Sequence, residues 1–293
     1  NLAQLCRTHL PAPAGIGMWL IAELAAMATD LAEFVGAAVG IALLTGMPLL
    51  HAMVVAGVLT YLLLTLQARG FRHIELMIGA LVAVIGISYI VQVWILPVSW
   101  AAALRQTLVP TALPPDAFML AAGIVGATVM PHALFLHSGL VNARVRPRSA
   151  SETSQLLRYS NREVVAALAA AGCINLAMVM VSAGAFHGTH VEVAGIEDAY
   201  VTLAPLFGAS AGLVFLVGLI ASGLSSSVVG TLAGQMVLQG FLRVRLPVWM
   251  RRLITMVPAF IVIGAGMDVT RALVLSQVIL SMVVPFPMAA LIW

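Results

Sequence analysis

Residues 123–141 read GIVGATVMPHALFLHSGLV, an apolar run that contains no Asp, Glu or Arg and is interrupted near its middle by a proline. A helix of about 20 apolar residues crosses the hydrocarbon core of a bilayer, so this run is typical of a membrane span. Pro131 has no N–H and clashes with the carbonyl of residue 127, which frees backbone groups from the helix. In a bilayer, such groups are tolerated where they are buried in protein or line a polar cavity. We expect a helix break near Gly126 and Pro131; a kink that serves packing alone is the alternative.

A methionine adjoins the expected break. The Met130 thioether is a soft ligand, from which hard cations such as Mg²⁺ and Ca²⁺ gain little, whereas Mn²⁺, Fe²⁺ and later transition metals accept it. Together with the carbonyl of Ala127, this sulfur has the character of half a transition-metal site. The alternative is a methionine that only fills space, as most do in apolar helices, and the chain holds 15 of them.

The composition is that of a bilayer protein. Of the 293 residues, 62% are hydrophobic and 9% are charged, whereas a soluble domain has about 45–50% and about 25%. A disordered chain and a disulfide scaffold are excluded, and a soluble enzyme is disfavoured. The net charge of +3 rests on 14 cationic residues, all arginine. Such an excess in a membrane chain reports the loops that face the cytoplasm, so nucleic acid is not implied as a partner.

The hydropathy pattern predicts an all-α, polytopic membrane fold with eight transmembrane helices. We expect one transmembrane domain over residues 1–293, with no separate soluble domain. The eight apolar runs cover residues 14–45, 48–66, 75–97, 117–142, 163–187, 209–240, 252–266 and 271–292.

The arginines predict the orientation of these spans. With a cytoplasmic amino end, twelve of the 14 arginines fall in inner segments, and Arg105 and Arg271 are the two outside. Short cytoplasmic loops carry such an excess, so both ends of the chain are expected in the cytoplasm. The inner segment from Arg144 to Arg162 is polar, and we interpret it as a solvated loop.

The first span contains three carboxylates that a bilayer does not tolerate on a lipid-facing surface. Glu23, Asp30 and Glu33 lie on one face of a helix, because residues seven apart nearly eclipse and Glu33 follows by about 60°. Ionisable groups inside spans are functional hypotheses, and protonatable groups along a water-filled path relay protons. The alternative is that these carboxylates pair with arginines and only fix the helix register.

Two segments resemble the Nramp family of proton-coupled divalent metal transporters. MPHALFLHSGLV, residues 130–141, resembles the sixth span of that family, and DLAEFVGAAVGIALLTG, residues 30–46, resembles its third span. The resemblance implies a leucine-transporter-like inverted repeat, of which this chain carries spans three to ten.

The resemblance also implies roles for individual residues. The Met130 sulfur and the Ala127 carbonyl are expected to bind the metal, and Gln277 is expected to approach it in some conformations. The residues of the proton path and of an inner polar network are expected to be Asp30, Glu33, His132, Glu23, Arg251 and Arg252.

One family motif is absent from the sequence. The first span of the family carries an Asp-Pro-Gly-Asn string that supplies oxygen ligands to the metal, and no such string occurs in residues 1–293. Discontinuous helices of inverted-repeat transporters come in pairs from corresponding positions of the two halves. We therefore expect an amino-terminally truncated domain that lacks two spans and part of the ligand set.

These observations predict a symporter that imports Mn²⁺ or Fe²⁺ through the cytoplasmic, inner membrane, driven by protons. Its partners are the metal ion, protons and the lipid bilayer, and no resident cofactor and no enzymatic activity are expected. One alternative is a sodium-coupled symporter of an organic solute such as an amino acid, with the same architecture. Another is an intramembrane metalloenzyme that uses His132 and His137, but their spacing is not that of an HExxH motif.

Overall fold

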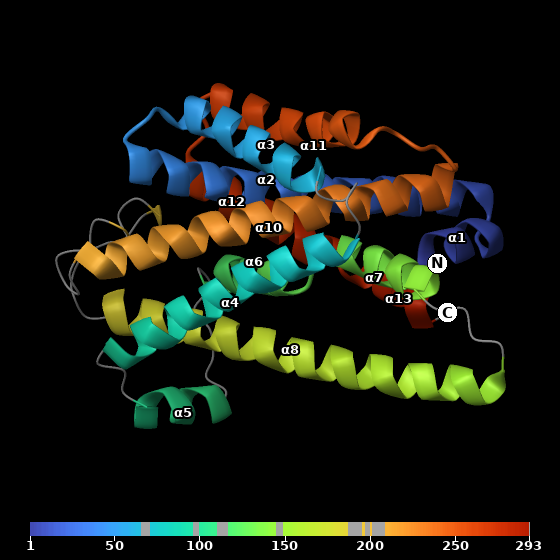
Figure 1. Cartoon of the computed structure of the whole chain (residues 1–293), viewed down its shortest axis with the longest axis horizontal. Helices are drawn as coiled ribbons and strands as arrows, with labels where there is room; N and C mark the ends of the chain where they lie inside the picture. The colour runs from blue at the N-terminus through green and yellow to red at the C-terminus, as the bar shows by residue number, and fades with distance from the viewer. Residues whose placement is uncertain are drawn as a thin grey trace. The chain divides into compact units, whose positions relative to one another are not determined.

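The computed structural model describes residues 1–65, 71–95, 100–109, 117–144, 149–186, 195–196, 200 and 209–292. Every regular element within these ranges is an α-helix (Figure 1), which confirms the predicted all-α class. The chain forms two compact units. The larger contains Asn1–Ile85, Ala112–Gly139 and Val193–Trp293, and the smaller contains Gly86–Thr111 and Leu140–Glu192. The expectation of one transmembrane transporter domain stays a prediction.

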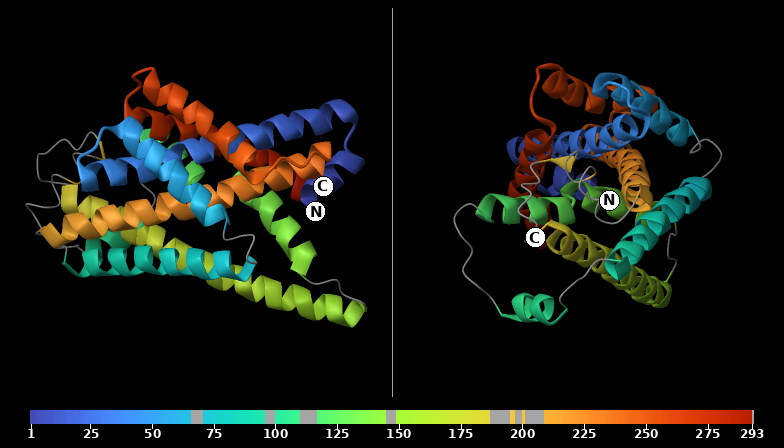
Figure 2. Two further views of the ribbon diagram at one scale, coloured as in Figure 1. Left: turned by 45° about the horizontal axis from the view of Figure 1, so that its top comes forward. Right: turned by 90° about the vertical axis from the view of Figure 1, so that its left-hand side faces the viewer.

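The larger unit is built on two long helices, α2 (Ala12–Thr45) and α10 (Ala209–Leu242). They run side by side in both Figure 1 and Figure 2. Glycines make this close approach possible: a Cβ atom at Gly40 would lie 2.7 Å from Ile220 Cγ1, and one at Gly223 would lie 2.7 Å from Ala37 Cβ. Small residues let membrane helices pack closely, so this pair forms the tight centre of the unit.

Shorter helices surround this pair. α3, α11 and α12 pack against α2, α1 packs against α10, and α6 packs against α12. Their bounds are α1 (Leu2–His9), α3 (Leu49–Thr65), α6 (Ala117–Thr128), α11 (Val248–Gly264), α12 (Val269–Val283) and α13 (Pro285–Ile292). α7 (Pro131–Arg144) and α4 (Phe71–Ile95) each have residues in both units.

Local sequence explains several of the helix ends. Gly46 follows the last residue of α2, adopts a left-handed φ of 73° and donates its N–H to the Ala42 carbonyl. Glycine is favoured there because it has no Cβ to clash in this conformation. α12 begins after Asp268, whose side chain accepts a hydrogen bond from the Arg271 N–H at 2.8 Å. Such caps satisfy backbone groups that the helix leaves without partners.

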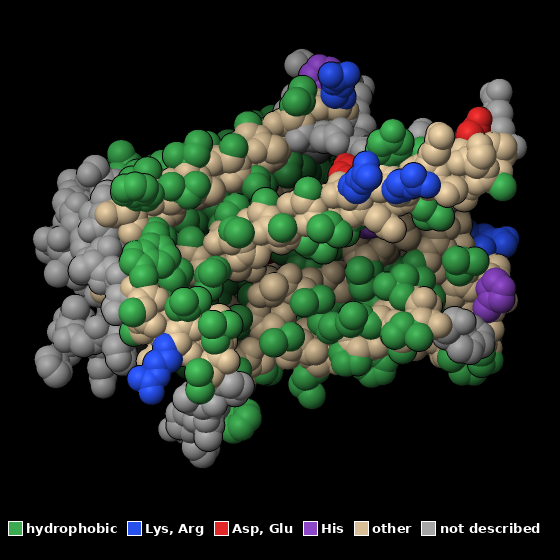
Figure 3. All heavy atoms as spheres, turned by 90° about the horizontal axis from the view of Figure 1, so that it is seen from below, with side chains coloured by type: hydrophobic (Ala, Val, Ile, Leu, Met, Phe, Trp, Pro, Cys, Tyr) green, Lys and Arg blue, Asp and Glu red, His purple; other side chains and the backbone are tan. Residues whose placement is uncertain are grey.

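The smaller unit contains α5 (Trp100–Leu108), α8 (Ala150–Phe186) and the second half of α4. α4 and α8 touch where a Cβ atom at Gly86 would lie 3.4 Å from Ile174 Cδ1. Most of the apolar side chains on α8 are exposed, among them Val165 and Leu168. Hydrophobic side chains likewise cover much of the face drawn in Figure 3, as expected for surfaces that meet lipid.

Six described segments are long and apolar enough to cross a membrane: Ala12–Thr45, Leu76–Trp94, Ala117–Val141, Ala150–Gly184, Gly212–Leu242 and Val269–Ile292. The other two predicted spans correspond to α3 and α11, which have 17 residues each. The predicted loop from Arg144 to Arg162 is wrong after residue 149, because α8 begins at Ala150 and runs through the polar stretch. Ser149 starts this helix by accepting a hydrogen bond from the Glu152 N–H at 3.2 Å.

Candidate functional site

The predicted break is present between α6 and α7. α6 ends at Thr128, α7 begins at Pro131, and the two residues between them are not helical. The Val129 N–H still bonds to the Val125 carbonyl at 2.9 Å. Because Pro131 has no N–H, the Ala127 carbonyl receives no hydrogen bond from the fourth residue after it. The interruption thus lies directly before Pro131, whereas Gly126 lies inside α6.

The residues predicted to bind metal lie at or near this break. Ala127 is exposed and Met130 is half-buried. Gln277 is half-buried on α12, where its Nε2 donates to Ser276 Oγ at 3.3 Å. α12 packs against α6, and the backbone of Gln277 contacts Gly126. The contact of α6 with α12 at Gly126 thus adjoins the break, and the roles of Met130, Ala127 and Gln277 as metal ligands stay predictions.

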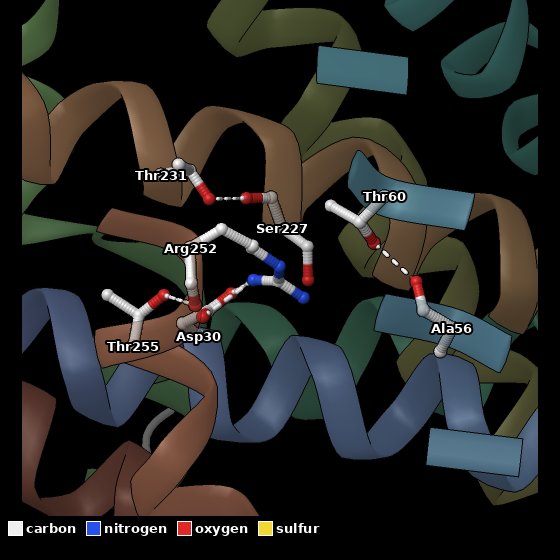
Figure 4. A network of polar contacts seen from close by, with 7 residues as sticks. All are labelled: Asp30, Ala56, Thr60, Ser227, Thr231, Arg252 and Thr255. Atoms are coloured by element: carbon white, nitrogen blue, oxygen red, sulfur yellow. Dashed lines mark hydrogen bonds and ion pairs between the residues drawn. The ribbon is translucent and has the colours of Figure 1, made fainter. Parts of the chain in front are cut away.

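Two carboxylates of α2 form ion pairs with neighbouring arginines of α11. A single nitrogen of Arg252, Nη1, lies 2.5 Å from Asp30 Oδ1 and 2.6 Å from Oδ2 (Figure 4). Nη1 of Arg251 donates in the same way to Glu23 Oε1. Asp30 is 1% exposed and Arg252 is 2% exposed. Charges this deeply buried require a partner, and each ion pair joins a carboxylate of α2 to a guanidinium of α11, so that the two charges neutralise each other.

The surroundings of the arginines are polar only in part. The Arg252 guanidinium carbon lies 4.9 Å from the centroid of the Phe34 ring, a distance that permits a cation–π interaction. Within the described residues, Nε and Nη2 of both arginines have no hydrogen-bond partner, and neither has Glu23 Oε2. For Glu23 and Asp30, the geometry fits the alternative of structural pairing, and their part in proton movement stays a prediction.

His132 follows the break and is completely buried, at 0% exposure. Its Nδ1 lies 3.3 Å from the hydroxyl of Thr29, the residue before Asp30, and its Nε2 has no partner in the described part of the chain. His137 is exposed, so the two histidines do not share an environment. The described residues contain no group of three or more His, Cys, Asp or Glu able to hold a metal.

Glu33 differs from the other two carboxylates of its face. It is half-buried, and the hydrogen bonds and ion pairs among the described residues do not involve its side chain. Its backbone carbonyl lies against Gly223 of α10. Glu33 is therefore the carboxylate of α2 whose side chain forms no ion pair within the described residues, and its part in proton movement stays a prediction.

Sequence reasoning missed two neighbours of the charged and polar groups. Thr29 and Phe34 are both buried. Thr29 contacts His132 and Phe34 contacts Arg252, from elements far apart in the chain. The sequence places Thr29 and Phe34 close to Asp30, but this proximity does not identify the residue that each of them contacts.

The family model described as "Natural resistance-associated macrophage protein-like", Nramp, matches residues 1–293. The chain belongs to the Nramp family. A protein of Verminephrobacter eiseniae named divalent metal cation transporter MntH is 57% identical over 293 residues, which are 100% of this chain and 67% of the relative. A protein of the same name from Deinococcus radiodurans is 50% identical over 293 residues, again 100% of this chain and 67% of the relative.

A solved structure is also similar to this Nramp chain. The manganese transporter of Eremococcus coleocola, in complex with an aromatic bis-isothiourea substituted compound, superposes with a TM-score of 0.86 at 31% identity. The match covers 99% of this chain and 66% of the transporter. This Nramp chain thus spans about two thirds of the length of the relatives it matches. The similarity confirms the predicted polytopic, all-α membrane fold.

Proposed function

We propose that this Nramp chain belongs to a proton-coupled symporter that imports Mn²⁺ or Fe²⁺ through the cytoplasmic, inner membrane by alternating access. The observation that carries the proposal is the interrupted helix, where the soft sulfur of Met130 adjoins the carbonyl freed at Ala127. A sulfur ligand favours softer dications over Ca²⁺ and Mg²⁺. Gln277 belongs to the same site, because α12 carries it against α6.

The buried polar residues of α2, α7 and α11 support the proton part of the proposal. Ionisable groups inside membrane spans mark proton relays and ion pathways. His132 Nε2 and Glu23 Oε2 have no partner among the described residues, which leaves both atoms open to a hydrogen bond with a water molecule. The proposed path consists of Asp30, Glu33, His132, Glu23, Arg251 and Arg252.

The relatives support a metal substrate over an organic one. Two of them are named divalent metal cation transporters, and the similar structure is that of a manganese transporter. A sodium-coupled amino acid symporter of the same architecture has no comparable support. The proposed partners are the metal ion, protons and lipid, with both ends of this chain in the cytoplasm, as the arginine distribution favours.

Transport by the full-length protein in lipid vesicles tests the metal site. With Met130→Ala, the apparent affinity for Mn²⁺ is expected to fall by about tenfold, with Ca²⁺ becoming a better competitor, because the soft ligand is lost. Met119→Ala is the control, since Met119 is an exposed methionine on α6, the helix that precedes the break. An unchanged preference of Met130→Ala for Mn²⁺ over Ca²⁺ would show that the sulfur does not select the metal.

A further inference from the structure

The contact between α6 and α12 is closest at Gly126. A Cβ atom on this glycine would overlap the Gln277 carbonyl oxygen, and it would lie 2.8 Å from the Gln277 carbonyl carbon and 2.9 Å from the Ser281 nitrogen. Real Cβ atoms do not approach other heavy atoms this closely. The space that a side chain needs at residue 126 is therefore taken up by the backbone of α12.

The contacted atoms belong to one hydrogen bond of α12. In an α-helix, each N–H donates to the carbonyl four residues earlier, so the Ser281 N–H donates to the Gln277 carbonyl. A side chain at residue 126 has two outcomes. It moves α6 away from α12, or it enters this hydrogen bond and distorts α12 at Gln277.

The conformation of Gly126 does not require a glycine. Within the described residues, the glycines with positive φ are Gly46 and Gly266. Gly126 lies inside α6, two residues before its end, in a backbone conformation that alanine also adopts. Gly123, one turn earlier on α6, is different in its surroundings, since a Cβ atom there would meet nothing within 4 Å. The need for glycine at residue 126 thus comes from the approach to α12.

This approach links the two sides of the proposed metal site. Gly126 directly precedes Ala127 and lies four residues before Met130, while the backbone that it contacts is that of Gln277. We propose that Gly126 is a positioning residue, which sets the separation between the interrupted segment and Gln277 and thereby the affinity for the transported dication. This inference rests on the proposed function.

Mn²⁺ uptake by the full-length protein in lipid vesicles tests the inference. Gly126→Ala is expected to raise KM for Mn²⁺ by about tenfold, since a displacement of about an ångström at a binding site has effects of this size or larger. KM is independent of how much protein is folded. Gly123→Ala, the matched control on the same helix, is expected to keep the KM of the unchanged protein.

A double variant separates positioning from a general structural effect. Gln277→Ala alone is expected to raise KM, and adding Gly126→Ala to it is expected to change KM by less than about twofold, because residues that act through each other are not additive. If the effects of Gly126→Ala and Gln277→Ala on KM multiply in the double variant, the proposal is overturned. An unchanged KM in either single variant would overturn it as well. A Gly126→Ala protein that fails to reach the membrane, when Gly123→Ala reaches it, would also overturn the proposal, by assigning the glycine to folding. Absence of Mn²⁺ uptake by the unchanged protein would instead contradict the proposed function.

Discussion

Asp30 places a carboxylate inside α2, where it is 1% exposed, and both of its oxygens lie within 2.6 Å of one nitrogen of Arg252. A buried ion pair of this kind contributes little net stability, because desolvation of the two charges offsets much of their attraction. What the pair does is make each charge dependent on the other. Removing one partner leaves the second charge buried without compensation.

We therefore expect Asp30→Asn to destabilise the protein by about 3–5 kcal/mol, the usual effect of breaking a buried pair. Thermal unfolding of the detergent-purified protein measures the loss. The double variant with Arg252→Gln is expected to recover part of it, because both charges are then absent. Asp268→Asn is the control, since this carboxylate is exposed at the start of α12 and asparagine caps a helix equally well. Equal losses of thermal stability in Asp30→Asn and Asp268→Asn would contradict the mutual dependence of the Asp30 and Arg252 charges.

The sequence predicted this group of charges only in part. Periodicity places Glu23, Asp30 and Glu33 on one face of α2, because the helix repeat alone determines which residues share a face. The pairing of Asp30 with Arg252 depends on how α11 crosses α2, which no local pattern encodes. For the same reason, the contact of Thr29 with His132 was not predicted, although Thr29 adjoins Asp30.

The start of α8 shows where hydropathy fails as a predictor of helix bounds. The apolar run begins near residue 163, but the helix begins at Ala150 and includes a polar stretch with Arg158 and Arg162. Hydropathy reports where a helix meets lipid, whereas helix formation also follows from caps and intrinsic propensity. Ser149, followed three residues later by Glu152, was the available signal for this start.

Ser149→Ala is expected to loosen the first turn of α8, because the Ser149 hydroxyl accepts from the Glu152 N–H at 3.2 Å. Loss of such a cap costs about 1 kcal/mol, which corresponds to about fivefold faster amide exchange in the first turn. Hydrogen exchange read by mass spectrometry on peptides that cover residues 150–156 measures it. Ser154→Ala, at an exposed site inside the same helix, is expected to leave the exchange unchanged. Equal exchange in both variants would remove the capping role.

The arrangement of helices was predictable as far as composition and period decide it. Each of the eight apolar runs contains an α-helix in its described part, and the break before Pro131 follows from the missing N–H of proline. The contact of Gly126 with the Gln277 backbone was not predictable, because small residues permit close packing without naming the partner helix. The sequence thus predicts which faces are buried, and folding decides which faces meet.

The proposed coupling of metal uptake to protons requires a group that exchanges a proton within the membrane. Among the three carboxylates of α2, Glu33 is the one whose side chain forms no ion pair within the described residues. Its replacement removes a protonatable group and leaves the Glu23–Arg251 and Asp30–Arg252 pairs intact. Within the proposed proton path, Glu33 is therefore the carboxylate whose replacement tests proton movement without breaking an ion pair.

Glu33→Gln is expected to retain Mn²⁺ uptake while the accompanying acidification of the vesicle lumen falls by at least about tenfold, because glutamine has nearly the same shape but cannot relay a proton. A pH-sensitive dye and Mn²⁺ flux, recorded on the same vesicles, give the ratio of protons to metal. Glu163→Gln is the matched control, because Glu163 is exposed on α8 and outside the proposed path. If the ratio for Glu33→Gln equals that for Glu163→Gln, protons do not pass through Glu33, and the relay must run through the paired carboxylates or His132.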